Sequence, residues 1–375
     1  MLAELPPVAV IGEPVSMVDT PALLLDLDAF EHNLRQMAAL AERGGLALRP
    51  HAKAHKSVAI ASAQIAQGAA GICCQKLSEA YPFAAAGVKN IFISNQFAGP
   101  KKVAMAVELA RQAELSVCVD HPAQVRALGE AAQRHGVRVA VLPEIDVGHE
   151  RCGVADADGL LTLVDAIAAQ PALSFAGIQA YHGGAQHISD WVQRRDVSRR
   201  SAELTAQFLR CLEAHGIRCS IVTGGGTGSA EFDVENGVLT EIQPGSYALM
   251  DRHYGSLEWL GTLQLQHSLF IAATIMSTAR PGKAVCDVGL KSVAVDSGLP
   301  EVWQQRDADG LRYVGAYDEH GMLETGGDRR DRLGEPFLLV PGHVDPTVNL
   351  YRELVCVRRG RVEGLWNIDA RGLSR

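Results

Sequence analysis

A lysine within a polar segment is the clearest candidate for covalent chemistry. Lys53 lies in RPHAKAHK, residues 49–56, directly after a short apolar stretch. A lysine that is partly desolvated at the mouth of a fold has a lowered pKa, and its free amine can then form a Schiff base. Lys56 fits a surface lysine better, because it falls one turn into an expected helix. Lys53 is therefore the predicted nucleophile.

Two glycine-containing turns are the candidates for binding a phosphate group. The run TGGGTGS, residues 223–229, exposes backbone N–H groups and lets an anion approach closely. The tripeptide Gly245-Ser246-Tyr247 ends a later apolar stretch. No Gly-Lys-Ser/Thr follows the glycine run, so it is not a Walker loop. A lysine nucleophile together with a phosphate site suggests pyridoxal phosphate (PLP), the commonest cofactor that needs both.

The segment VPGHVDPT, residues 340–347, contains a histidine and an aspartate two residues apart. In an extended segment such residues point to the same face, so His343 and Asp345 could share one cation. An H-x-D pairing is common by chance, and its spacing alone does not establish a metal site.

The elements that must position these residues follow a βαβ rhythm, which is typical of a parallel sheet covered by helices. Eight candidate strands predict a (β/α)8 TIM barrel, with a doubly wound sheet as the alternative. The strands are expected at residues 46–52, 71–75, 90–95, 115–120, 137–145, 175–182, 219–223 and 238–248. Helices are expected at residues 56–67, 77–86, 100–113, 122–135, 156–169 and 190–215.

Polar residues gather at the carboxyl ends of these strands, which is where a TIM barrel has its active site. Lys53 follows the first strand and Gln75 ends the second. Arg151 follows the fifth strand, Tyr181 ends the sixth, and His187 lies in the loop beyond it. The two glycine turns follow strands seven and eight, between which barrels often bind a phosphate.

Two segments lie outside the predicted barrel of residues 44–255. Residues 1–43 contain the strand-like TPALLLDL and a helix expected to be capped by Asp28. Residues 256–375 lose the helical period and predict an all-β domain that carries the H-x-D motif. Within that domain, residues 300–335 are expected to form a polar, loop-like spacer.

Composition and charge restrict the class of protein. The 375 residues are 47% hydrophobic and 21% charged, as in ordinary soluble proteins, and the net charge is −8. Nucleic acid and acidic membranes are therefore poor partners. The eight cysteines form no C-x-x-C pair, and the first residues have prolines where a signal peptide needs an apolar run. We expect a cytoplasmic protein that acts on a small molecule.

These motifs together resemble the D-threonine aldolase and D-serine dehydratase-like family, fold-type III PLP enzymes related to the alanine racemases. The resemblance rests on DTPA at residues 19–22, RPHAKAHK, GICCQKLSEA, EIDVGHERCG, YHGGAQH, TGGGTGS, GSY and PGHVDPT. It implies a barrel plus a C-terminal β domain, joined in a head-to-tail homodimer. It also implies that the strand near residues 20–26 belongs to the β domain, so residues 1–43 are expected to pack with it.

The resemblance further implies roles for individual residues. Lys53 would carry PLP, Arg151 would approach its ring, Tyr181 would line the pocket, and His343 and Asp345 would bind a divalent metal. The phosphate would be held by Gly225, Gly226, Thr227, Ser246 and Tyr247. Gln75 and Gly245, at strand ends, complete the expected cofactor contacts. No residue is assigned to the ring nitrogen.

The aspartate of the H-x-D motif distinguishes two branches of this family. Dehydratases of the D-serine type have a cysteine two residues after the histidine, which suits Zn²⁺, whereas Asp345 suits Mn²⁺ or Mg²⁺. The expected reaction is retro-aldol cleavage of a D-3-hydroxy amino acid, with D-threonine giving glycine and acetaldehyde. His187 is the candidate base for the hydroxyl proton.

Several alternatives stay open at this point. Cleavage of 3-hydroxy-D-aspartate to glycine and glyoxylate would need a further cation, for which Arg194, Arg195 and Arg252 are candidates. A metal-dependent dehydratase of D-serine or 3-hydroxyaspartate is a second alternative. A racemase has no use for the H-x-D motif, and a non-enzymatic PLP-binding barrel needs no second domain.

Overall fold

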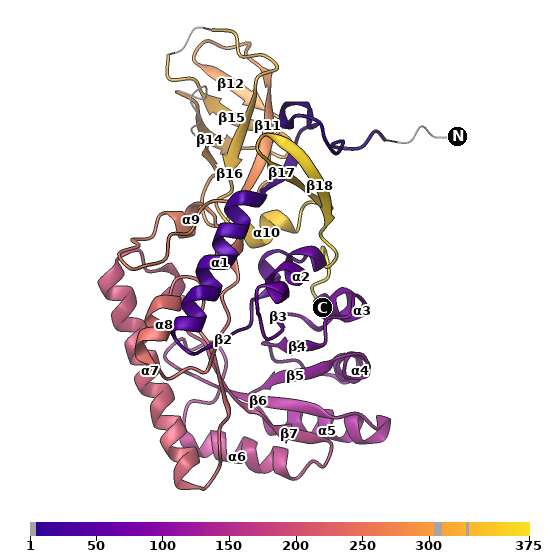
Figure 1. The fold of residues 1–375 in the computed structure, drawn as a ribbon, viewed down its shortest axis with the longest axis vertical. Helices are drawn as coiled ribbons and strands as arrows, with labels where there is room; N and C mark the ends of the chain where they lie inside the picture. The colour runs from indigo at the N-terminus through magenta and orange to yellow at the C-terminus, as the bar shows by residue number, and fades with distance from the viewer. Residues whose placement is uncertain (1–4, 304–309, 328–329) are drawn as a thin grey trace.

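The computed structural model describes residues 5–303, 310–327 and 330–375. Figure 1 shows two parts, a helix-covered barrel and an all-β part stacked on one end of it. The N-terminal and C-terminal segments of the chain meet in the all-β part.

Eight parallel strands form the barrel wall in the order β2-β10-β9-β8-β6-β5-β4-β3. Their bounds are β2 Ala47–Leu48, β3 Ile72–Cys74, β4 Asn90–Ile93, β5 Glu114–Val119, β6 Val139–Ile145, β8 Gly177–Ala180, β9 Ile221–Gly224 and β10 Glu241–Ile242. A parallel bridge between His51 and Cys73 joins the two ends of this order and closes the barrel. The predicted barrel is confirmed, and the doubly wound alternative is excluded.

Three barrel strands differ from the prediction. The strand expected at 175–182 is split into β7 (Leu173–Phe175), which pairs with the start of β6, and β8, which pairs with its end. Gly177 begins β8 at a point where a Cβ atom would lie 1.9 Å from the Ile221 carbonyl oxygen, so only glycine allows this approach. The strands β2 and β10 are two residues long, and the rest of each predicted strand forms turns that carry site residues.

Helices follow the strands and cover the outside of the barrel. Their bounds are α2 Val58–Ala66, α3 Leu77–Ala85, α4 Pro100–Ala110, α5 Pro122–His135, α6 Ala157–Ala168 and α7 Trp191–Ala214. Aspartates cap two of them, because Asp156 accepts the N–H of Gly159 and Asp190 accepts that of Gln193. A further helix, α8 (Ala230–Asn236), directly follows the glycine run, where the sequence pattern predicted no element.

The N-terminal segment is divided between the two parts. Strand β1 (Ala22–Asp26) pairs with strands of the all-β part, as the resemblance implied. Helix α1 (Leu27–Arg43) instead runs down to the barrel and packs against β2 and α8 (Figure 1). Its N-cap is Asp26 and not the expected Asp28, because β1 ends at Asp26 and that carboxylate accepts the N–H of Asp28 at 2.9 Å.

The all-β part is one nine-stranded sheet that includes β1. The other strands are β11 Leu269–Ser277, β12 Lys283–Cys286, β13 Glu301–Val302, β14 Arg312–Ala316, β15 Gly321–Glu324, β16 Pro336–Val340, β17 Glu353–Arg358 and β18 Arg361–Asn367. The spacer expected at 300–335 is wrong for its described residues, because β13, β14 and β15 lie there. Its residues 304–309 and 328–329 lie outside the described part of the chain.

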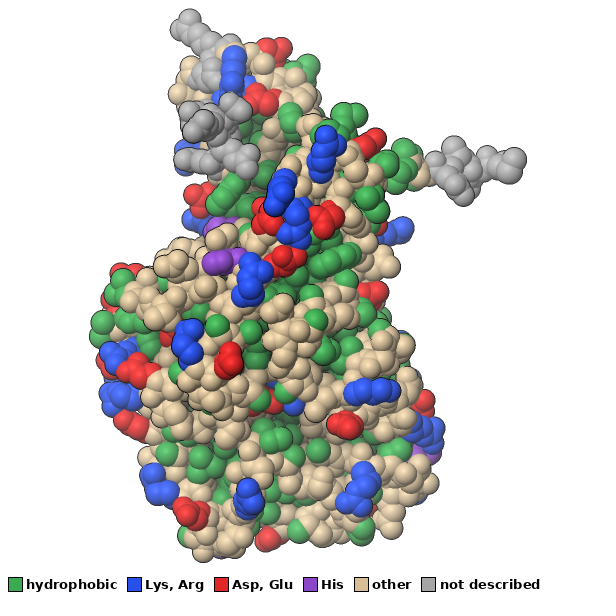
Figure 2. Space-filling model, viewed as in Figure 1, with side chains coloured by type: hydrophobic (Ala, Val, Ile, Leu, Met, Phe, Trp, Pro, Cys, Tyr) green, Lys and Arg blue, Asp and Glu red, His purple; other side chains and the backbone are tan. Residues whose placement is uncertain are grey.

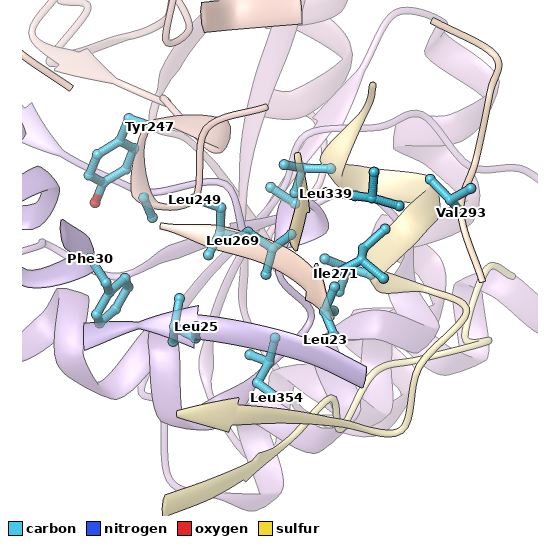
Figure 3. Packing of buried hydrophobic residues seen from close by; sticks show 14 of the residues in the cluster. Leu23, Leu25, Phe30, Tyr247, Leu249, Leu269, Ile271, Val293, Leu339 and Leu354 are labelled. Atoms are coloured by element: carbon cyan, nitrogen blue, oxygen red, sulfur yellow. The ribbon is translucent and has the colours of Figure 1, made fainter. Parts of the chain in front are cut away.

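The barrel and the sheet share one apolar core. Buried side chains run continuously from Leu25 in β1 and Leu269 in β11 to Tyr247 and Leu249 after β10 (Figure 3). The C-terminal residues also return to the barrel, where the Ala370 N–H donates to a barrel carbonyl at 2.9 Å. Because this core crosses the boundary, it holds the facing loops of the two parts at defined relative positions.

The face of the molecule drawn in Figure 2 carries side chains of both charges. Figure 2 shows acidic and basic side chains interspersed on the face drawn, without a continuous basic patch. Among the described residues, no helix has the length and apolar character that crossing a membrane requires.

The shared core predicts a stability effect. Leu25→Ala is expected to lower the free energy of unfolding by about 2–5 kcal/mol, because the fully buried side chain leaves a cavity. Urea denaturation followed by circular dichroism measures the change. The matched truncation Leu260→Ala, at a side chain that is 71% exposed, is expected to cost less than about 0.5 kcal/mol. Equal losses in the two variants would contradict the role of β1 in the core.

Candidate active site

One cavity of about 560 Å³ lies where the carboxyl ends of the barrel strands face the all-β part. The loops after seven barrel strands line it, and the all-β part contributes the segment around α10 (Val344–Val348). The predicted site residues that line it are Lys53, Gln75, Arg151, Tyr181, His187, Gly225, Gly226, Thr227, Gly245, Ser246, His343 and Asp345. Tyr247 is the one predicted residue that does not.

Lys53 lies in a short turn, η2 (Ala52–Ala54), directly after β2. Its ammonium group forms an ion pair with the carboxylate of Asp345 from the all-β part. Burial by itself would lower the pKa of Lys53, as expected from the sequence, but the attraction of Asp345 outweighs burial and raises that pKa. The expected depression is therefore wrong for this form of the protein, because a carboxylate lies against the amine.

Lys56 is not a surface lysine. It is buried, its ammonium lies 3.2 Å from Glu79 Oε1, and it donates to Asn349 Oδ1 at 3.0 Å. It lies before α2, with a φ of 52°, and outside the cavity. Among the described residues, Lys53 is thus the only lysine that lines the cavity.

The H-x-D segment is not extended, contrary to the prediction. His343 is the N-cap of α10, and Asp345 lies in the first turn of that helix. The His343 Nδ1 atom lies 2.7 Å from Asp296 Oδ2, so Nε2 is the ring nitrogen available to a ligand. Asp345 Oδ1 is buried and has no hydrogen-bond partner among the described residues. One imidazole nitrogen and one carboxylate oxygen are therefore available in the same cavity.

This donor set fits a divalent cation, since imidazole and carboxylate suit ions such as Mn²⁺. In the described part of the chain, no group of three or more histidine, cysteine, aspartate or glutamate side chains could hold a metal ion. Two protein ligands leave coordination positions for water or substrate, as in open catalytic sites. Asp251 fixes the segment, because its carboxylate accepts the N–H of Val344 at 2.9 Å.

The glycine run forms a tight turn between β9 and α8. Gly225 has a φ of 68°, and a Cβ atom there would lie 2.3 Å from Asp233 Oδ2. The amides of Gly226 and Gly228 already donate to Ser229 Oγ and Gln186 Oε1.

The neighbouring amides are the ones that suit an anion. Those of Thr227, Gly245 and Ser246 have no hydrogen-bond partner among the described residues. These N–H groups, at the ends of β9 and β10, are donors that a phosphate requires. The PLP phosphate therefore fits this turn, with Lys53 lining the same cavity.

Tyr247 departs from its predicted role. Its side chain is 1% exposed and packs in the shared core, where Gln64 Nε2 donates to its hydroxyl at 3.2 Å (Figure 3). Its N–H donates to Thr227 Oγ1 at 3.0 Å. Tyr247 therefore connects the two phosphate-binding turns from behind, and its hydroxyl does not face the cavity.

His187 lies at the mouth of the cavity with a partner that the sequence analysis missed. Its Nδ1 atom is 2.9 Å from Nε2 of His253, which belongs to the short helix α9 (Arg252–Gly255). The pKa of His187 is lowered by burial first and then by electrostatic interactions with His253, His343 and Lys53. Both rings are therefore neutral near pH 7, since the pKa of His253 is also lowered, mainly by burial.

The other predicted cofactor contacts also line the cavity. The guanidinium of Arg151 lies over the Tyr181 ring, 5.3 Å from its centroid. His51 is 3.2 Å from Gln75 Oε1, and burial lowers its pKa to about 3, so it is neutral. Because the Lys53 N–H donates to His51 Nδ1 at 3.3 Å, the proton of that ring is on Nε2.

Comparison with known proteins agrees with this geometry. The family model for the alanine racemase N-terminal domain matches residues 25–253, and a serine dehydratase domain model matches residues 268–357. The chain is 49% identical to a D-threonine aldolase from Arthrobacter sp., over 99% of this chain and 97% of that protein. The chain belongs to the D-threonine aldolase and D-serine dehydratase-like family of fold-type III PLP enzymes.

Two further members of the family show the range of relatives. A 3-hydroxy-D-aspartate aldolase from Paracoccus denitrificans is 39% identical, over 96% of this chain and 94% of the relative. The crystal structure of D-threonine aldolase from Filomicrobium marinum superposes with a TM-score of 0.95 at 43% identity, covering 98% of this chain and all of that one. PLP is the cofactor of this family, and the cavity described above has the lysine and the free amides that PLP needs.

Polar residues around the cavity that the sequence analysis did not assign to the site include His51, Asp251, His253 and Asp296. His51 and His253 had a usable signal, because each lies within a few residues of a predicted site residue at a strand end. Asp296 had none, since 47 residues separate it from His343 along the chain.

The turn after β9 generates a prediction about cofactor affinity. A Cβ atom on Gly226 would lie 2.6 Å from Gln186 Oε1, so Gly226→Val must displace that side chain from the turn. Overpacking of about 1–3 kcal/mol corresponds to a PLP dissociation constant raised about tenfold to a hundredfold. Titration of the apoprotein with PLP, followed by absorbance, measures it. Gly364→Val, where the nearest atom is 3.8 Å away, is the control and should leave the affinity unchanged.

Proposed function

We propose that this protein is a PLP- and divalent-metal-dependent lyase that cleaves D-3-hydroxy amino acids into glycine and an aldehyde. The observation that supports this most directly is the meeting of Lys53 with Asp345 of the H-x-D motif in one cavity. A lysine for PLP and a cation ligand thus lie within reach of one small substrate. The identities to aldolases of this family support the same reaction.

The proposed cofactor contacts follow from the cavity lining. Lys53 would hold PLP through its amine, and Arg151, Tyr181 and Gln75 would surround the ring. The turns at Gly225, Gly226, Thr227, Gly245 and Ser246 would hold the phosphate, with the unpaired amides of Thr227, Gly245 and Ser246 as donors. When bound, PLP draws off the electron pair released at Cα, and the metal lowers the pKa of the substrate's β-hydroxyl.

His343 and Asp345 are the proposed metal ligands, with Mn²⁺ or Mg²⁺ favoured over Zn²⁺ because one donor is a carboxylate and neither is a thiolate. Asp296 orients His343 through Nδ1 and so presents Nε2 to the ion. A bound cation would also compete with Lys53 for the Asp345 carboxylate and release the amine for the cofactor.

His187 is the proposed base that removes the hydroxyl proton. It lines the cavity, and its lowered pKa keeps it neutral and able to accept a proton near pH 7. As the proton moves to His187, the oxygen keeps the electron pair and forms the new carbonyl. The Cα–Cβ bond breaks and leaves its electrons at Cα, which then takes up a proton to give glycine.

The arginines considered for a second substrate carboxylate are all engaged elsewhere. Arg194 is buried and donates to main-chain carbonyls, including Gly228 at 3.0 Å. Arg195 pairs with Glu235 at the surface. Arg252 lies 3.6 Å from Glu301.

None of these three arginines lines the cavity, whose described lysine and arginine side chains are Lys53 and Arg151. Both serve the proposed cofactor. Among the described residues, no lysine or arginine that lines the cavity is therefore left for a β-carboxylate, which favours D-threonine over 3-hydroxy-D-aspartate.

We further propose that the protein is a cytoplasmic homodimer. It would act on a small molecule and have no nucleic-acid or membrane partner. All eight cysteines are free thiols, five of them buried, which suits a reducing compartment. Val192 on helix α7 is an exposed apolar side chain, and a second subunit would cover such a group.

Product analysis tests the reaction. With PLP and Mn²⁺, D-threonine is expected to give equimolar glycine and acetaldehyde, measured by chromatography after derivatisation. D-threonine should be cleaved with a higher kcat/KM than 3-hydroxy-D-aspartate, because a second carboxylate meets no free cation. L-threonine is the control and should be inert. If the products were ammonia and a 2-oxo acid, the aldolase hypothesis would be wrong and the protein would be a dehydratase.

Metal removal tests the role of His343 and Asp345. Chelation is expected to abolish cleavage while the absorbance of bound PLP is retained, and Mn²⁺ should restore activity better than Zn²⁺. Asp345→Ala should behave like the chelated protein and should not recover with Mn²⁺, because one ligand is missing. Asp165→Ala, at an exposed position on α6, is the matched control. Full activity of the chelated protein would contradict the proposed requirement for a metal.

A further inference from the structure

Two loops of the barrel bring a pair of histidines together at the cavity mouth. His187 ends the turn η3 (Gly183–His187) after β8, and His253 lies in α9 after β10. His187 Nδ1 and His253 Nε2 are 2.9 Å apart, and the ring centroids are separated by 4.8 Å. This is a hydrogen bond between two imidazoles that belong to different strand ends.

A neutral imidazole has one N–H donor and one acceptor nitrogen. Only one proton can therefore lie between these two rings when both are neutral. If His253 donates, the proton of His187 is on Nε2, and that ring can accept nothing further. If His187 donates from Nδ1, its Nε2 lone pair is free. The partner ring thus decides whether His187 can act as a base.

Both loops are anchored to other parts of the site. Asp251, the N-cap of α9, accepts the N–H of Tyr254 and that of Val344, each at 2.9 Å. Val344 lies between the two proposed metal ligands. The position of His253 is therefore coupled through Asp251 to the metal-binding segment.

His187 is coupled to the phosphate-binding turn through its neighbour Gln186. The Gln186 Oε1 atom accepts the N–H of Gly228 at 2.8 Å, and its Nε2 donates to Ser229 Oγ at 2.9 Å. The hydrogen bond between His187 and His253 therefore links the turn after β9, through Gln186, to the segment that contains His343 and Asp345, through Asp251.

We propose that His253 is a positioning residue that accepts the Nδ1 proton of His187 and so leaves Nε2 of His187 as the acceptor for the substrate's hydroxyl proton. The inference rests on the proposed function, which requires a base at His187. When Nε2 takes the proton, His187 becomes an imidazolium, and its hydrogen bond to His253 becomes charge-assisted and stronger. The proton then leaves from His187 to solvent, because the side chain is exposed.

The tautomer of His187 can be determined without measuring catalysis. Protein labelled with ¹⁵N-histidine is studied by magic-angle-spinning NMR above pH 7, and the His187 signals are assigned as those lost in His187→Asn. A protonated Nδ1 and an unprotonated Nε2 on His187 are expected. Observation of the reverse tautomer would overturn the inference, and because this measurement needs no turnover, it is independent of whether the protein is an aldolase.

Kinetics test the consequence. His253→Phe keeps a ring but no acceptor, and kcat for D-threonine should fall about tenfold to a hundredfold, with the PLP dissociation constant unchanged. His253→Gln offers an amide oxygen to His187 Nδ1 and should recover most of the loss.

His215→Phe, at an exposed position after α7, is the control and should match the wild type. Wild-type kcat in His253→Phe, or equal losses in the Phe and Gln variants, would contradict the positioning role. Absence of cleavage in the wild type would instead contradict the proposed function.

Discussion

The ion pair between Lys53 and Asp345 joins the two parts of this protein at the cavity they share. Neither residue could form the site alone, because one follows a barrel strand and the other begins a helix of the all-β part. A partly buried ion pair requires good geometry to offset the loss of hydration. The apolar core that crosses the boundary, from Leu25 to Leu249, supplies that geometry by holding the two parts together. The same pair makes the proposed amine for the cofactor and the proposed carboxylate for the metal neighbours in one cavity.

Backbone groups contribute as much to the proposed site as side chains do. The turns after β9 and β10 present unpaired amides, and glycine is required where a Cβ atom would collide with Asp233 or Gln186. The small residues thus do two things: they leave space for an anion and allow polar side chains to support the turn from behind. Tyr247 belongs to that support, because its N–H is bonded to Thr227 while its ring fills the core.

In the proposed site, second residues orient the side chains that would bind the metal or accept the proton. Asp296 leaves one nitrogen of His343 for a cation, and Asp251 holds the intervening Val344. His253 likewise forms a hydrogen bond with His187 and would fix the position of its proton. In each case a second group selects the position of a proton or the direction of a ring. The reactivity of the site therefore depends on contacts that span the β8, β10 and β16 ends of the structure.

The sequence by itself determined the alternation of strands and helices, the closed barrel, and the positions of Lys53, the glycine run and the H-x-D motif along it. These are local features: periodicity follows from backbone geometry, and each motif directly follows its own strand. The separation of β1 from α1 and the raised pKa of Lys53 were decided only by tertiary structure, as were the inward ring of Tyr247 and the pairing of His187 with His253. The physical reason is that burial, protonation and side-chain direction depend on neighbours far away in the chain. Asp345 lies 292 residues from the lysine whose pKa it raises, and no local pattern encodes that contact.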